Sequence, residues 1–231
     1  MRTYKLYLIR HGLTQANLDG RYIGTTDLDL CEEGAVSLLS LQKEYEYPGV
    51  GRVYSSPLKR CLETARLLYP EITPIAVEEL REYHFGEFEN KTAEELLDNA
   101  SYREWLENAQ DVVPEGAEEM GQFRERVVQG FDRVIRDMMR ARVTEAAVIT
   151  HAGVISWFLS KCGLPKRPDH GWQVDAGKGY TVLVNASLWG NNQLAEVFTP
   201  LPYGCDQESV MLDYQHPLPE ELLDFEDEEL A

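Results

Sequence analysis

Residues 6–17 constrain the fold more than any other part of the sequence. Four apolar residues, 6–9, predict a buried strand that ends directly in Arg10, His11 and Gly12. Open α/β sheets place their ligand sites at the carboxyl ends of strands. A buried arginine is costly unless an anion or a carboxylate lies beside it. This stretch alone therefore predicts either an anion site or an internal ion pair at the end of a core strand.

Alternating strand and helix patterns follow along the chain. Further strands are predicted at 52–55, 72–77, 146–150, 180–185 and 194–198, with the last two joined by a turn at 190–192. Helical spacing predicts helices over 31–45, from Ser56 and Pro57 to about 69, and over 92–97, 117–140 and 152–161. Residues 98–116 have no regular pattern. The alternation predicts an α/β fold, a three-layer α/β/α sandwich with a mostly parallel central sheet.

Charge and composition narrow the classes of partner. The net charge is −18, and residues 207–231 hold nine acids and no Lys or Arg, which argues against binding nucleic acid. No apolar run approaches the ~18 residues of a membrane span, and no signal peptide opens the chain. The four scattered cysteines predict reduced thiols in a cytoplasmic protein without a zinc site.

The domain organisation follows from the same distribution of charge. We expect one main domain over residues 1–203 and an acidic extension over 204–231. Two interpretations of the extension stay open. It is either a solvated tail, or its residues 218–230 fold as a short amphipathic helix over a partner or the mouth of the site.

A second strand end repeats the first signature. His151 follows the apolar run 146–150 and precedes Gly153, as His11 follows residues 6–9. If both strands are central and parallel, the two imidazoles meet at one sheet edge. Arg60 is expected in the first turn of a helix, a position that attracts anions. Two arginines and two histidines suit a phosphoryl group, although each residue alone is equally consistent with a surface arginine or a packed core histidine.

Four segments carry a resemblance to a known family. They are RHGLTQAN at 10–17, SPLKRCLETA at 56–65, LREYHFGEFE at 80–89 and THAG at 150–153. In this order and over roughly residues 4–200, the sequence resembles the histidine phosphatase superfamily, also called the phosphoglycerate-mutase-like family.

The resemblance implies a role for each matched residue. His11 is implied as the nucleophile that forms a phosphohistidine. The implied phosphate ligands are Arg10, Asn17, Gly24, Arg60 and His151, with His151 also meeting the charge of the transition state. Glu82 is implied as the acid and base, although Glu87 and Glu89 are its chemical rivals and only family position favours it. No metal or cofactor is implied, because the cations supply the positive charge.

The same segments distinguish alternative functions. Glycolytic mutases of the family have an arginine after the acid/base glutamate and an arginine pair further on; here Tyr83 follows Glu82, and residues 91–116 have no adjacent arginines. This favours a phosphomonoester hydrolase of the bacterial branch that includes α-ribazole-phosphate phosphatases, acting on a small phosphorylated metabolite. Phosphoglycerate mutase activity and a non-catalytic phospholigand-binding protein are the alternatives. The aromatic residues Tyr83, Phe85 and Phe88 either line a substrate pocket or pack in the core.

Overall fold

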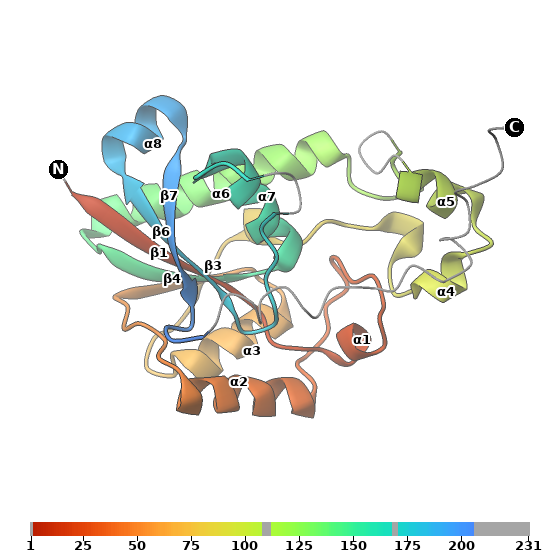
Figure 1. Ribbon diagram of the computed structural model, residues 1–231, viewed down its shortest axis with the longest axis horizontal. Coiled ribbons are helices and arrows are strands. Elements are labelled where there is room, and N and C mark those ends of the chain that lie inside the picture. Colours follow the sequence, from red (N-terminus) through yellow and green to blue (C-terminus); the bar gives the residue numbers. More distant parts are fainter. Residues whose placement is uncertain (1, 108–111, 168–170, 206–231) are drawn as a thin grey trace, which may run out of the picture.

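A seven-stranded sheet forms the centre of the molecule (Figure 1). The computed structural model describes residues 2–107, 112–167 and 171–205. The strand order is β3-β2-β4-β1-β6-β7-β5, and among these strands only β6 runs antiparallel to the rest. The strands are β1 Thr3–Arg10, β2 Arg52–Ser55, β3 Ile75–Ala76, β4 Glu145–Thr150, β5 Gly163–Leu164, β6 Gly179–Asn185 and β7 Ala195–Leu201. The predicted mostly parallel sheet is confirmed.

Helices cover both faces of the sheet, as the alternation of side chains along β1 requires. Leu6 and Leu8 pack into a core with residues of α6 (Met120–Ala141), α7 (Ala152–Cys162) and α8 (Ala186–Asn192). Tyr7 and Ile9 point to the other face, into a core with α3 (Lys59–Leu68), and α2 (Glu32–Glu44) packs beside α3 (Figure 1). Because successive strand residues point to opposite faces, the three-layer α/β/α sandwich follows, and that prediction is confirmed.

A smaller core lies beside the carboxyl end of the sheet. It is built from Phe88, Leu96 and Tyr102, on the turn Gly86–Phe88, α4 (Ala93–Leu96) and α5 (Ala100–Glu107). Phe88 is fully buried there, and Tyr83 is buried in the main core against Phe85 and Phe123. The core interpretation of Tyr83 and Phe88 is thus confirmed. The short helix α1 (Gln15–Leu18) and the turn Glu78–Leu80 complete the elements around this edge.

Local predictions differ from the structure at three places, through tertiary contacts or an unrecognised helix cap. α3 begins at Lys59 rather than at Pro57, and Ser56 makes contacts other than a helix cap. α5 lies within residues 98–116, where no helix was expected, and is held by aromatic packing of Tyr102 on Phe88. α8 replaces the predicted turn between β6 and β7, with Asn185 capping its first N–H groups.

The acidic extension falls almost entirely outside the described residues, since these end at 205. In the described part of the chain, no helix combines the length and apolar character needed to cross a membrane.

Candidate active site

Strand register brings the two predicted strand ends together. Arg10 lies opposite Thr150 in the β1–β4 pair, and Ser55 lies opposite Ile149 in the β2–β4 pair. The residues that follow these strands therefore emerge at one sheet edge. The imidazoles of His11 and His151 lie there with ring centroids 5.1 Å apart in an edge-to-face arrangement.

His11 is held in one tautomer. Its Nδ1–H donates to the carbonyl of Gly12 at 2.6 Å, which leaves Nε2 unprotonated. That nitrogen accepts a hydrogen bond from Arg60 Nε at 3.2 Å. Burial, together with the charges of Arg60 and Arg10, holds the pKa of His11 well below its usual value. The ring is therefore a neutral imidazole with its basic nitrogen at the centre of the site.

Arg60 lies between the two histidines, in the first turn of α3. Its Nη2 contacts His151 Nδ1 at 3.2 Å and the carbonyl of Gly24 at 2.6 Å, and Nη1 donates to the carbonyl of Thr26 at 2.8 Å. Among the described residues, every hydrogen-bond acceptor of Arg60 is a neutral group. The guanidinium is 1% exposed, and burial lowers its pKa. Its positive charge is positioned but not neutralised by direct contact.

Arg10 supplies a second buried cation at the end of β1. Its Nη1 donates to the carbonyl of Val174 at 2.9 Å. Burial lowers the pKa of Arg10 to about 10, opposed by the nearby carboxylates of Glu82 and Asp175. It thus remains protonated at neutral pH and contributes to the positive potential around His11.

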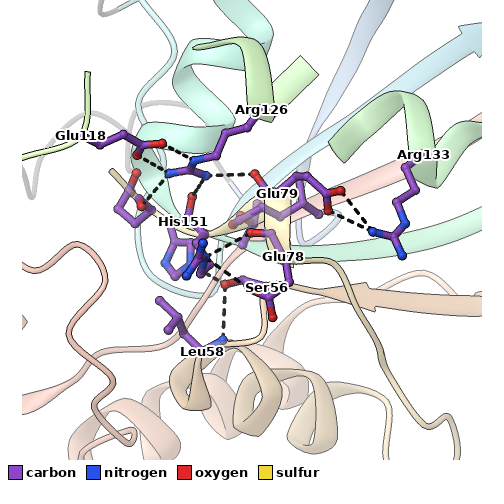
Figure 2. A network of polar contacts seen from close by, with 12 residues as sticks. Ser56, Leu58, Glu78, Glu79, Glu118, Arg126, Arg133 and His151 are labelled. Carbon is purple, nitrogen blue, oxygen red and sulfur yellow. Dashed lines mark hydrogen bonds and ion pairs between the residues drawn. The ribbon is translucent and has the colours of Figure 1, made fainter. Parts of the chain in front are cut away.

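His151 is oriented by a residue that the sequence did not assign to the site. Its Nδ1 accepts from Arg60, so Nε2 carries the proton and donates to Ser56 Oγ at 2.8 Å (Figure 2). Burial and the charge of Arg60 hold the pKa of His151 well below its usual value. We predicted Ser56 as a helix cap; its position directly after β2 was the signal that could have placed it here.

Glu82 is the buried carboxyl group of the site. Its Oε1 accepts a hydrogen bond from the backbone N–H of Tyr83 at 3.0 Å, and its Oε2 accepts one from the backbone N–H of Gly153 at 2.9 Å. Burial raises the pKa of Glu82, although these two N–H groups and Arg60 act in the opposite direction. A carboxyl group with a raised pKa can hold a proton closer to neutral pH.

The two rival glutamates have other contacts. Glu87 accepts from Asn99 Nδ2 at 2.8 Å, and this bond holds the pKa of Glu87 below its usual value. Glu89 accepts from the N–H groups of Gly24 and Thr25 at 3.0 and 2.9 Å and so fixes that loop. Neither shares the contact with the first turn of α7 that Glu82 makes.

Of the two remaining predicted phosphate ligands, Gly24 contacts Arg60 and Asn17 bonds to Thr14. The Oδ1 of Asn17 accepts from the N–H of Thr14 at 3.1 Å, which leaves the NH₂ of the amide as the end that can donate to a ligand. Gly24 gives its N–H to Glu89 and its carbonyl to Arg60. A Cβ at position 24 would lie 1.8 Å from the carbonyl oxygen of Tyr83, so only glycine fits there. Gly24 therefore contacts Arg60 through its carbonyl, while its N–H is engaged by Glu89.

A hydroxyl outside the predicted set connects two parts of the site. Thr64 Oγ1 accepts from the N–H of Gly12 at 3.0 Å and donates to the carbonyl of Arg60 at 2.7 Å. Thr64 lies one turn after Arg60 on α3, within the matched segment 56–65, which was the available signal.

The chemistry of the donors indicates the kind of ligand. Guanidinium and imidazole N–H groups bind oxyanions, and guanidinium forks match phosphate geometry. Over residues 2–107, 112–167 and 171–205, no group of three or more His, Cys, Asp and Glu side chains could hold a metal ion. The four cysteines are thiols rather than halves of a disulfide.

Comparison with known proteins assigns the family. The family model described as histidine phosphatase superfamily (branch 1) matches residues 6–190. The chain belongs to the histidine phosphatase superfamily. This confirms the resemblance stated from the four sequence segments, and membership of the histidine phosphatase superfamily supports phosphatase activity.

Individual relatives agree with this assignment. The chain is 28% identical to the adenosylcobalamin/alpha-ribazole phosphatase of Escherichia coli (strain K12), over 78% of this chain and 90% of the relative. It is 30% identical to a metal-independent phosphoserine phosphatase of Arabidopsis thaliana, over 65% of each. The crystal structure of the alpha-ribazole phosphatase from Shigella flexneri superposes with a TM-score of 0.70 at 26% identity, covering 84% of this chain and 95% of that one.

Proposed function

We propose that this histidine phosphatase hydrolyses the phosphomonoester of a small metabolite through a phosphohistidine at His11. One observation carries the proposal. The unprotonated Nε2 of His11 faces Arg60, a buried cation whose direct partners are neutral, with His151 beside it. Phosphate oxygens bound by these cations would bring phosphorus next to the nucleophilic nitrogen.

The first half of the reaction transfers the phosphoryl group to the protein. Nε2 of His11 forms a bond to phosphorus as the bond to the ester oxygen breaks. Glu82, whose pKa is raised by burial, donates its proton to the departing alkoxide. Arg10, Arg60 and His151 hold the phosphoryl oxygens, and the bound anion raises the pKa of His151 toward the charged form.

The second half returns the protein to its starting state. A water molecule attacks phosphorus, gives a proton to the Glu82 carboxylate, and the phosphorus–nitrogen bond breaks to release inorganic phosphate. No step routes charge through a metal ion, since the two guanidinium groups carry out that stabilisation. The name of the Arabidopsis relative is consistent with metal independence.

The substrate class is argued from chemistry that the relatives share. Their names refer to alpha-ribazole phosphatase and to phosphoserine phosphatase, whose substrates share little beyond a phosphomonoester. We therefore propose a small phosphomonoester as the substrate, and we assign phosphoglycerate mutase activity and non-catalytic phospholigand binding as alternatives for the test.

The test compares wild type with His11→Ala on p-nitrophenyl phosphate in EDTA. Wild type should release p-nitrophenol and accumulate an acid-labile, base-stable phosphoprotein on rapid quenching, and the variant should do neither. A panel of sugar phosphates, nucleotides, phosphoglycerates and cobamide precursors then identifies the substrate. Binding without turnover across the panel would favour a phospholigand-binding protein, and phosphoryl return to a phosphoglycerate would favour a mutase.

A further inference from the structure

The segment that carries Glu82 has little regular structure of its own. After the turn Glu78–Leu80, residues 81–85 form neither helix nor strand in the described structure. Buried carbonyl groups still require hydrogen-bond partners, which such a segment must find elsewhere in the fold. Those partners determine the position of the Glu82 backbone, and with it the position of the Glu82 side chain.

A single guanidinium supplies several of these partners in and just before the segment. Arg126, in the second turn of α6, donates from Nη1 to the carbonyls of Glu79 and Arg81 at 2.9 and 2.6 Å. Its Nη2 donates to the carbonyl of Glu82 itself at 2.9 Å. Figure 2 shows Arg126 reaching across to this segment from its helix. The side chain therefore fixes the backbone of the proposed acid and base.

Arg126 is itself held rigidly. Its Nε and Nη2 donate to the two carboxylate oxygens of Glu118 at 2.6 and 2.7 Å (Figure 2), and both side chains are only 17% exposed. The guanidinium also lies over the ring of Phe123. Arginine has five N–H donors, and all five are used in these bonds and the three to the carbonyls. Lysine, with three donors around one point, cannot reproduce the arrangement.

The carboxyl end of Glu82 leaves little room for displacement. Besides its bond to Gly153, the carboxylate lies so close that a Cβ at position 153 would be 2.5 Å from Glu82 Oε1. The intervening carbonyl of Leu80 is fixed by Thr150 Oγ1 at 2.8 Å. A small shift of the backbone at 81–83 would therefore withdraw the carboxyl group from α7 and from the leaving oxygen.

We infer that Arg126 and Glu118 are a positioning pair that sets the Glu82 carboxyl group against α7 for proton transfer. The inference rests on the proposed function, because it assumes that Glu82 is the acid and base. In the described part of the chain, the side-chain hydrogen bonds of this pair go to each other and to the carbonyls of residues 79, 81 and 82, so the pair acts on the site through the segment that carries Glu82.

The first experiment measures the dependence on leaving group. Arg126→Gln should lower kcat/KM for an alkyl phosphate such as glycerol phosphate roughly 10²-fold, since the alkoxide needs a well-placed acid. The loss should be much smaller on p-nitrophenyl phosphate, whose leaving group needs little protonation, and KM should change little. Arg126→Lys should not restore activity. The matched control, Arg136→Gln, removes an exposed ion pair with Asp132 on the same helix. It should leave kcat/KM unchanged for both substrates.

A double-mutant cycle tests whether the effect passes through Glu82. In a Glu82→Gln background, Arg126→Gln should cause almost no further loss on the alkyl phosphate, because groups that act as a unit are non-additive. An equal fold-loss in both backgrounds, or an equal loss with both leaving groups, would overturn the inference and leave Arg126 a general structural residue.

Amide hydrogen exchange at Gly153 gives a readout independent of activity. An N–H in the first turn of a helix has no intrahelical acceptor, so its protection reports the Glu82 contact. Exchange should accelerate in Arg126→Gln and Glu118→Gln but not in Arg136→Gln; unchanged exchange in the first two would overturn the positioning pair. If wild type proves inactive while exchange responds as expected, the proposed function fails and the positioning stands.

Discussion

Arginines gather in two regions of this molecule, and the two regions partner them differently. At the carboxyl edge of the sheet, Arg60 is almost fully buried and its direct acceptors are two carbonyls and two imidazoles. Burying a charge with neutral partners costs several kcal/mol, and the cost is offset when an anion binds. That edge is therefore prepared for a negatively charged ligand.

The second region is a hollow of about 540 Å³ between α6 and the edge of the sheet at β2 and β3. Three of its arginines each contact a carboxylate: Arg52 with Asp137, Arg133 with Glu79, and Arg136 with Asp132. These charges are neutralised within the protein, and the side chains are partly or largely exposed. The number of arginines in a hollow therefore says less about anion binding than the partners they already have.

The largest expected effect is the loss of activity when Arg60, the buried cation with neutral hydrogen-bond partners, is replaced. Arg60→Gln should lower kcat by at least roughly 10³-fold, as removal of a phosphoryl-binding arginine does elsewhere. The thermal midpoint should not fall in parallel, because the substitution removes a buried charge. Steady-state kinetics and thermal unfolding test both halves, and near-normal turnover would contradict the comparison.

The pH dependence of stability should reveal the neutral state of His11, which burial and the charges of Arg60 and Arg10 maintain in the fold. His11 is neutral in the fold and protonated when unfolded below pH ~6.5, so the unfolded state binds more protons and stability falls as pH falls. His11 should contribute up to about 1.4 kcal/mol per pH unit to this decline. Urea unfolding between pH 7 and 5 should show a shallower decline for His11→Asn. Identical slopes would mean that His11 is protonated in the fold.

In the hollow, where arginines are paired with carboxylates, a substitution should lower stability and leave activity unchanged, the reverse of Arg60→Gln. Arg52→Gln breaks the ion pair with Asp137, which also accepts from Tyr54 at 2.7 Å. We expect only a small loss in the free energy of unfolding, because the pair is partly exposed and screened by solvent. The kcat/KM value should be unchanged; a fall on the scale of Arg60→Gln would show that the hollow contributes to turnover.

The smallest effect should be a gain in stability when Glu82, the proposed acid and base, is replaced. Since burial raises the pKa of Glu82, its ionisation opposes folding at pH values above the pKa of the unfolded state. Glu82→Gln removes this cost and should therefore stabilise the protein slightly at pH 7 while lowering activity. The gain should vanish below pH ~4, where the unfolded side chain is protonated as well. Chemical denaturation at both pH values measures it.

The sequence predicted those parts of the fold and site that depend on local pattern. The apolar runs before His11 and His151 identified two core strands, and parallel pairing brought their ends together. Contacts between distant segments were not predictable in this way. Arg126 resembles any polar residue of an amphipathic helix, yet its carbonyl partners lie 44 to 47 residues earlier in the chain. Ser56 was mistaken for a cap for the same reason.

The bridging hydroxyl of Thr64 has a mechanical consequence. It joins the turn after His11, the proposed nucleophile, to the helix that carries Arg60, the proposed phosphate ligand. In the proposed reaction, relative motion of the sheet and α3 would otherwise change the distance between His11 Nε2 and the phosphorus atom. Because this one oxygen is bonded to both, the turn after His11 and the first turn of α3 are held to each other across the proposed site.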